Sequence, residues 1–270
     1  SCNAAKRDCF WLWPLKYSED DQSWFCAKYD WHNYCVYNFT NAGTIYFRVA
    51  MTDQYQIKKN NKVRQLSKKA SYDKETVHAI LDAGLVAHVA FNQENGPVVV
   101  PMLYGRKKNK IFLHGARKAR IIRLLEKTNR ASLNVTLLDG IVLARSTFNS
   151  SMHYRSVTIF GKPKIILNDQ EKLSAMKIIS ENTIPGRWDE VRDSHAKEIK
   201  MTGVIELTIE NASAKISSGP PDDEIEDYKI PIWAGVLPIT TKTGKLQRDE
   251  KLMEGIKPSQ NMLALQNKKL

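Results

Sequence analysis

Apolar runs of strand length, separated by tight-turn dipeptides, constrain the fold of this chain more than any other feature. Two of these dipeptides, Asn95-Gly96 and Asp139-Gly140, are typical of type I′ turns and predict β-hairpins. Within the longest run, Gly161 and Pro163 predict a bulge or an edge position. The predicted strands are residues 85–91, 97–104, 110–114, 131–138, 141–146, 154–167, 204–209 and 233–239.

Helical patterns interrupt the strands. Asp73 is a favourable N-cap for a short amphipathic helix that we expect to end at Gly84. Residues 117–125 form a short basic helical pattern, and residues 169–182 form a longer amphipathic one. Short antiparallel strands with few helices predict a mainly β protein, a partly closed antiparallel barrel with flanking helices. A doubly wound fold is not expected, because no G-x-G-x-x-G follows a first strand.

The charge balance of the chain favours anionic partners. Lysine and arginine number 41 against 29 aspartate and glutamate residues, which gives a formal net charge of +12. Such a chain attracts phosphate-bearing cofactors, nucleic acids or acidic lipid surfaces, and charge alone does not choose among them. No window approaches the roughly 18 to 20 apolar residues that a membrane-spanning helix needs, so we expect no membrane partner.

The first fifty residues differ in composition from the remainder. They hold all four cysteines, at positions 2, 9, 26 and 35, and four of the six tryptophans. The cysteine spacings match no zinc pattern. Residues 51–270 contain no cysteine, which is typical of a reducing compartment, so we expect a cytoplasmic protein. Met51 is a candidate natural start; the alternative is an added hairpin layer whose aromatic side chains pack on the core.

Three parts follow from these composition changes. Residues 58–69 carry six basic and no acidic side chains, which predicts a solvated linker, with a nucleic-acid-binding arm as the alternative. We therefore expect an N-terminal extension over residues 1–65, a barrel domain over 66–240 and a polar C-terminal tail over 241–270.

The segment from Phe112 to Arg120 is the strongest candidate for a binding site. It places Gly115 and three cations, the last of which is Arg120, where a predicted strand gives way to a helix. Free N–H groups at a helix start and the helix dipole favour an anion, and arginine binds phosphate oxygens in a bidentate manner. A solvated basic helix is the alternative, because the segment lacks the glycines of a P-loop.

Residues 143–157 form a second candidate. Arg145, Arg155 and several hydroxyl groups lie between two predicted strands, and such groups together suit phosphate and ribityl oxygens. The alternative is a polar loop in which Arg155 is an ordinary surface cation.

Six ordered blocks together resemble the flavin-nucleotide-binding branch of the pyridoxamine 5′-phosphate oxidase-like family. The blocks are residues 71–81, 112–120, 137–146, 153–157 with Gly161, 185–192 and 231–238. The resemblance covers about residues 66–240. It implies an FMN-binding split β-barrel that forms a homodimer, with FMN bound at the subunit interface.

The resemblance also implies which residues contact FMN. In the family, the segment after the third strand holds the FMN phosphate, which here corresponds to Arg117 and Lys118, with Arg120 one helical step further on. The other implied contacts are Val99, Val100, Pro101 and Met102 beneath the flavin, and Tyr154, Arg155 and Ser156. Ala116 replaces the serine of many relatives. Residues 233–238 lack the arginine of true pyridoxamine phosphate oxidases, so we do not expect vitamin B6 oxidase activity.

Histidines and tryptophans supply further candidates. His114 and His153 flank the two candidate segments and could donate to phosphate or flavin oxygens, or form structural hydrogen bonds. Trp188 and Trp233 could stack on the flavin ring or pack in the core. His88 lies within an apolar strand, which is more typical of a core histidine. No catalytic residue and no metal site follow from the sequence.

These observations predict an FMN-binding protein, an FMN-dependent oxidoreductase that acts on an unassigned small molecule or electron acceptor. NADH or NADPH is the candidate electron donor. The alternative is a non-catalytic flavin- or haem-binding module, with His88, His114 or His153 as the axial ligand. Nucleic-acid binding is least expected, because the basic region 106–130 lacks a recognition motif and an aromatic stacking platform.

Overall fold

The computed structural model describes residues 16–18, 23–30, 33–39, 45–50 and 53–269. The chain divides into two compact units, residues 1–54 and 55–270. In the first unit, antiparallel strands pair in chain order: β1 (Lys16–Ser18), β2 (Ser23–Asp30), β3 (Asn33–Phe39) and β4 (Ile45–Ala50). The side chains of residues 1–52 lie outside what the structure describes, and so does the expected packing of aromatic residues on the core.

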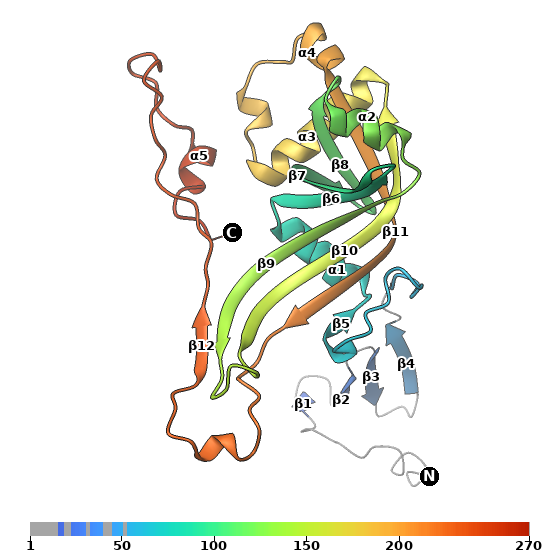
Figure 1. The fold of residues 1–270 in the computed structure, drawn as a ribbon, viewed down its shortest axis with the longest axis vertical. Helices are drawn as coiled ribbons and strands as arrows, with labels where there is room; N and C mark the ends of the chain where they lie inside the picture. Colours follow the sequence, from blue (N-terminus) through green and yellow to red (C-terminus); the bar gives the residue numbers. More distant parts are fainter. Residues whose placement is uncertain (1–15, 19–22, 31–32, 40–44, 51–52, 270) are drawn as a thin grey trace. The chain divides into compact units, whose positions relative to one another are not determined.

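The second unit is built on a closed ring of six antiparallel strands (Figure 1). The strands of the whole second unit are β5 (Ala70–Ser71), β6 (Val86–Gln93), β7 (Gly96–Lys107), β8 (Lys110–Ala116), β9 (Ala131–Leu143), β10 (Ser151–Ile166), β11 (Thr202–Ser217) and β12 (Gly235–Pro238). The ring runs in the order β6-β7-β8-β11-β10-β9, and β9 pairs with β6 to close it. β5 adds to β11, and β12 adds to the end of β9. The antiparallel split barrel predicted from the sequence is confirmed.

Short helices flank the barrel. They are α1 (Lys74–Ala83), α2 (Arg120–Lys127), α3 (Asp169–Thr183), α4 (Ala196–Met201) and α5 (Gln260–Ala264). The predicted cap of α1 is present, since a carboxylate oxygen of Asp73 accepts from the Thr76 N–H at 2.8 Å. Asn168 caps α3 in the same way, at 3.0 Å from the Glu171 N–H. Single 3₁₀ turns lie at Ser67–Lys69 (η1), Trp188–Glu190 (η2) and Asp227–Lys229 (η3).

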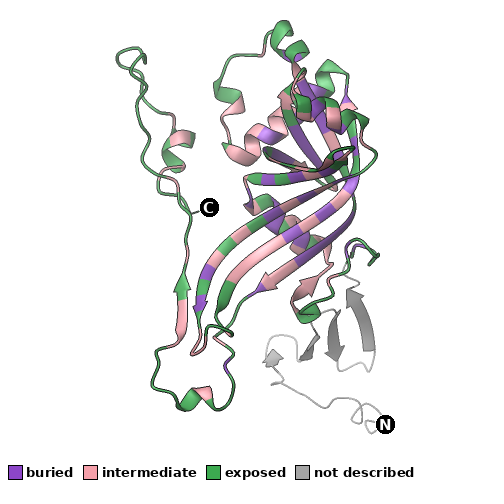
Figure 2. Cartoon of the chain, in the orientation of Figure 1, coloured by how far each residue is buried: buried purple, intermediate pink, exposed green. Residues whose placement is uncertain are grey.

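Apolar side chains at alternate strand positions fill the ring and appear as the buried stripes in Figure 2. Tyr104 is among the largest of these side chains and is fully buried, with its hydroxyl donating to the Leu81 carbonyl. α3 covers the outer face of β7 at Gly105, where a Cβ would lie 2.6 Å from the Ile178 carbonyl oxygen. Glycine is therefore required at this position for the helix backbone to approach the strand.

Asp139-Gly140 does not form the predicted turn. β9 runs unbroken from residue 131 to 143, and the chain reverses over residues 144–150 instead. Opposite it, His153 pairs with Gly140 while Tyr154 pairs with Leu138, so Asp139 is the extra residue of a β-bulge. The same dipeptide suits a turn or a bulge, and pairing with β10 and β12 decides between them. A register shift between β10 and β11 lies at Gly161, where a bulge was predicted, but the extra residue is Glu210 on β11.

Candidate functional site

The segment predicted to bind an anion lies where β8 gives way to α2. The backbone N–H of Arg117 donates to the Met201 carbonyl at 2.7 Å, which ties the connection to the chain just before β11. At Gly203 on β11, a Cβ would lie 2.5 Å from the Ile122 side chain and 3.3 Å from the Arg117 Cα. The missing side chain lets the connection and the start of α2 lie against the barrel.

The start of α2 is electropositive and lacks a side-chain cap. Its N-cap residue is Ala119, and its first turn contains no acidic residue. The first N–H groups of the helix therefore have no side-chain acceptor, and they add to the positive end of the helix dipole. This arrangement suits a phosphate group.

The three predicted phosphate ligands differ in how they are held. Arg117 donates through both terminal nitrogens to Glu126, at 2.9 and 3.1 Å. Arg120 donates to the Gln93 side-chain oxygen at 2.7 Å. Lys118 is exposed and has no hydrogen bond or ion pair with any residue that the structure describes. An incoming anion would meet Lys118 first and would compete with Glu126 for Arg117.

The outer face of β7 presents an apolar row beside this site. Val99 is 60% exposed and Leu103 is 42% exposed, with Pro101 between them. Val100 and Met102, which were also predicted to lie beneath a flavin, point toward the core because side chains alternate along a strand. A flat ring on this face would therefore contact alternate residues of the predicted set.

His114 and Trp188, both predicted site residues, come together in a small hollow beside this row. The hollow has a volume of about 230 Å³. Its walls are Leu103, His114, Met176, Ile179, Ser180, Thr183, Ile184 and Trp188. The pKa of His114 lies below its ordinary value because the surrounding protein partly removes water from the ring. The lowered pKa favours the neutral form of the imidazole.

Tyr154, Arg155 and Ser156 lie on β10, far from the α2 cations. Arg155 donates to both carboxylate oxygens of Asp139, at 2.9 and 2.8 Å, and this contact lowers the pKa of Asp139. Ser156 Oγ lies 3.1 Å from the Asn134 amide and 2.9 Å from the Thr136 hydroxyl. These side chains form a polar ladder across β9 and β10.

Two pairings fix the separation of the predicted contacts. Tyr154 pairs with Ser217 at one end of β11, and Ala116 pairs with Thr202 at the other end. β11 has 16 residues, so at about 3.3 Å per residue its ends lie about 50 Å apart along the strand. That is far more than the length of one flavin mononucleotide. A single chain does not bring the two predicted sets of contacts together.

Trp233, Arg145 and His88 lie apart from both predicted sets of flavin contacts. Trp233 is 71% exposed, and its ring lies over Gly235 at the start of β12. Arg145 forms an ion pair with the buried carboxylate of Asp223 at 2.9 Å, so it anchors the loop after β11. The prediction of a core position for His88 is wrong, since Ala87 and Val89 face inward and His88 is exposed on the outer face of β6.

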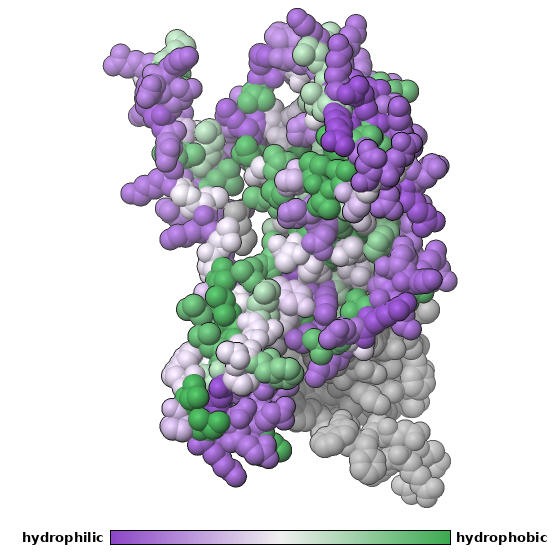
Figure 3. Space-filling view, in the orientation of Figure 1, coloured by the Kyte–Doolittle hydropathy of each residue, from purple (hydrophilic) through white to green (hydrophobic). Residues whose placement is uncertain are grey.

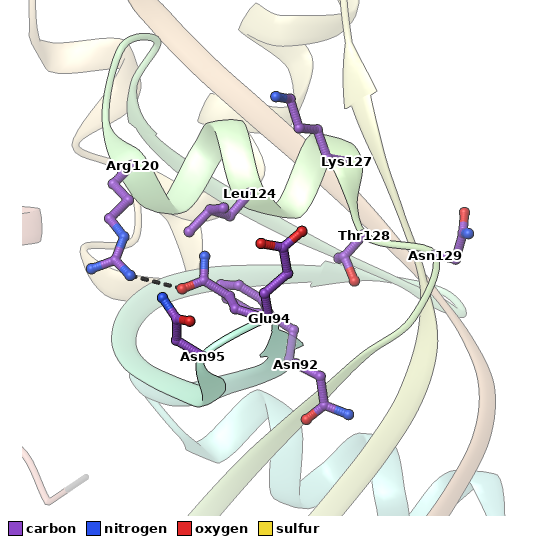
Figure 4. Close-up of a pocket in the computed structure, with 10 residues that line it drawn as sticks. Asn92, Glu94, Asn95, Arg120, Leu124, Lys127, Thr128 and Asn129 are labelled. Carbon is purple, nitrogen blue, oxygen red and sulfur yellow. Dashed lines mark hydrogen bonds between the residues drawn. The ribbon is translucent and has the colours of Figure 1, made fainter.

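Sequence reasoning missed a cavity of about 620 Å³ between the β6–β7 hairpin and α2 (Figure 4). It is lined by Phe91, Asn92, Gln93, Glu94, Asn95, Arg120, Leu124, Lys127, Thr128 and Asn129. Of these residues, only Arg120 was predicted to be a site residue. A run of amide and carboxylate side chains over residues 92–95 was the available signal, and its partner wall lies some 25 to 35 residues further along the chain.

A comparison with protein-family models identifies the family of this chain. A sequence model of the family described as pyridoxamine 5′-phosphate oxidase matches residues 73–216, more than half of the chain. The chain belongs to the pyridoxamine 5′-phosphate oxidase family. The resemblance inferred from the six sequence blocks is thereby confirmed.

Two solved structures are similar to this chain in both sequence and fold over most of its length. The flavocytochrome Anf3 from Azotobacter vinelandii is 35% identical, with a TM-score of 0.74, and the match covers 77% of this chain and 97% of that chain. The FAD and haem binding protein from Mycobacterium smegmatis is also 35% identical, with a TM-score of 0.71, and the match covers 74% of this chain and 98% of that chain. No curated protein matches the chain significantly.

The chain also carries an apolar outer row where β9 pairs with β10 and β12. Ile141 pairs with Met152 on β10 and with Leu237 on β12, and the three side chains are 41%, 50% and 54% exposed. Figure 3 shows apolar side chains gathered over the projecting ends of β9 and β12. Among the described residues, no helix has the length and apolar character needed to span a membrane.

Proposed function

We propose that this chain is a flavin-binding redox protein that works as a homodimer, with each flavin bound between two subunits. The observation that carries the proposal is the separation of the two predicted contact sets at opposite ends of β11. One flavin reaches both sets only if the second set comes from another chain. The exposed row of Ile141, Met152 and Leu237 supports such a partner, because contiguous apolar side chains on a sheet favour burial.

In this proposal the start of α2 holds the flavin phosphate. Lys118, Arg120 and the uncapped N–H groups supply positive charge, and Arg117 joins them when it leaves Glu126. Val99, Pro101 and Leu103 provide an apolar bed that keeps water from one face of the ring. A bound flavin would supply hydride or single-electron transfer. The neutral His114 ring beside this bed can donate or accept a hydrogen bond there.

The flavin is FMN or FAD. FMN is the expectation from the sequence, and the Mycobacterium smegmatis relative is described as binding FAD. A small electron acceptor or substrate, NADH or NADPH as donor and a cytoplasmic location complete the proposal. No residue is given a catalytic role.

A haem beside the flavin is the second candidate function. Both 35% identical relatives are described as haem-containing proteins, one as a flavocytochrome and one as a FAD and haem binding protein. His114 supports this candidate, since an imidazole beside apolar side chains such as Leu103 and Met176 is a common type of axial ligand. The test is the absorption spectrum of the haem-loaded protein. His114→Ala should remove the shifted Soret band, whereas His153→Ala should keep it.

Subunit complementation tests the main proposal. Lys118→Ala with Arg120→Ala removes cations, and Tyr154→Ala with Ser156→Ala removes the β10 contacts. Neither variant alone should bind flavin. A one-to-one mixture, reassorted after mild denaturation, should regain about one quarter of the sites, because half of the dimers are mixed and each has one intact site. No recovery from two folded variants would refute a shared site.

A further inference from the structure

A second cavity lies between the barrel and residues 241–269, here called the C-terminal arm, which contacts η2 (Figure 1). Its volume of about 460 Å³ falls within the range of about 300 to 1,000 Å³ that is usual for small-molecule sites. Its lining side chains come from residues 82–85 after α1, from residues 182–187 at the end of α3, and from the arm.

Specific contacts hold the arm, so the cavity has a defined outer wall. The Asn261 amide donates to a Glu190 carboxylate oxygen at 3.0 Å. At Gly186, where φ is +78°, a Cβ would lie 2.4 Å from the Asn261 side chain, so glycine lets the arm approach. The Thr243 N–H donates to the Lys268 carbonyl at 3.0 Å, and the Lys268 N–H donates to the Thr243 hydroxyl at 3.0 Å. These two bonds close the arm on itself.

The apolar part of the lining is aliphatic. It consists of the side chains of Leu85, Ile184, Leu246, Met262 and Leu265, with an alanine and a proline. Among the described residues that line the cavity there is no aromatic ring and no histidine. A flat ring would therefore find no ring to stack on, whereas an alkyl chain gains from burial against any aliphatic surface.

Two of the four charged side chains in the lining already have a partner. Arg106 donates to both carboxylate oxygens of Asp82, and Arg187 forms an ion pair with Glu190 at 3.2 Å. These two side chains therefore contribute no free charge to the cavity.

The other two charged side chains are Lys268 and Lys269, which are exposed at the edge of the cavity. Neither forms an ion pair with any residue in the described part of the chain, although Lys269 helps to lower the pKa of Asp139. Unpaired ammonium groups beside an aliphatic cavity favour a ligand that carries a carboxylate on an alkyl chain.

We propose that this cavity binds a medium-chain fatty acid, with its carboxylate at Lys268 and Lys269 and its alkyl chain among the aliphatic side chains. None of the lining residues belongs to the predicted flavin contacts, so the site does not depend on the proposed flavin function. Thr183 and Ile184 also line the hollow around His114, so a bound chain lies on the other side of these two side chains from that hollow.

Calorimetric titration of the full chain with decanoate, with decanol as the uncharged probe, tests the role of the lysines. The unmodified chain should bind one decanoate, at least about tenfold more tightly than decanol. Lys268→Ala with Lys269→Ala should lower decanoate affinity at least about tenfold and change decanol affinity less than about twofold. Lys251→Ala with Lys257→Ala removes the same charge from exposed positions of the arm outside the cavity and should change neither.

A second pair of variants tests the cavity itself. Leu246→Trp fills it from the arm and should lower the affinities for both probes at least about tenfold. Leu252→Trp adds the same bulk at a leucine of similar exposure outside the lining, 38% against 40%, and should change neither. Circular dichroism shows that each variant is folded. Equal binding of the two probes, or decanoate binding that survives the lysine change, would overturn the proposal, and either result would leave the flavin function untouched.

Discussion

Arg155 holds the bulged residue Asp139 through two parallel hydrogen bonds, Nε to Oδ2 at 2.9 Å and Nη2 to Oδ1 at 2.8 Å. The bulge places Asp139 outside the normal strand alternation, and Arg155 on the neighbouring strand donates to its carboxylate. Arg155 was predicted to contact the flavin. In one chain its role is to stabilise the bend at which β9 and β10 project from the barrel.

This ion pair gives a pH-dependent prediction. The hydrogen bonds from Arg155 lower the pKa of Asp139, so their contribution to stability is present above about pH 4 and is lost as pH falls through the lowered pKa. Both side chains are more than a third exposed, so Asp139→Asn should lower the free energy of unfolding by about 1 kcal/mol or less at pH 7. Urea unfolding at pH 7 and pH 3 measures this. An equal loss at both pH values would contradict it.

The competition between Glu126 and phosphate for Arg117 can be measured directly. Glu126→Gln removes the negative partner of Arg117 and leaves its guanidinium available to the flavin phosphate. We expect FMN affinity to rise about threefold to tenfold, equivalent to about 0.6 to 1.4 kcal/mol. Inorganic phosphate should show the same direction. Weaker binding in this variant would mean instead that Glu126 positions the guanidinium for the phosphate.

Gly203 controls how closely the anion site lies against the barrel. In Gly203→Ala the added methyl group would meet the Ile122 side chain and the Arg117 backbone, which must both shift. We expect a loss of about 1 to 3 kcal/mol in the free energy of unfolding, together with weaker FMN binding. Gly244→Ala is the matched control, because nothing lies within 4 Å of a Cβ there. Chemical denaturation and FMN titration of the two variants provide the comparison.

The sequence was sufficient for most strands and helices of the barrel and for the family. Apolar runs of strand length and the Asp73 cap are local signals, and so is the run of cations after β8. The bulge at Asp139 could not be predicted, because it depends on pairing with β10 and β12. Val100 and Met102 point inward because of which face of β7 packs on the core, and the sequence does not show that face. The cavity between the β6–β7 hairpin and α2 is lined by two segments that are far apart in the chain, so no local pattern predicts it.

The last prediction concerns the partner surface. Ile141, Met152 and Leu237 lie side by side across three strands and remain exposed in the single chain, while Val142 faces the other way and is only 5% exposed. In Ile141→Lys a charge would enter the proposed interface, and we expect the dimer to dissociate at least about tenfold more readily, with loss of flavin binding.

Sedimentation velocity over a range of concentrations, with circular dichroism as the folding control, measures this effect. Ile57→Lys places the same charge on an isoleucine that is 53% exposed and lies before β5, outside β9, β10, β12 and α2. It should leave both the association and the flavin content unchanged. If Ile141→Lys remained dimeric and kept its flavin, the second subunit would have to dock elsewhere, and the β10 contacts would need another explanation.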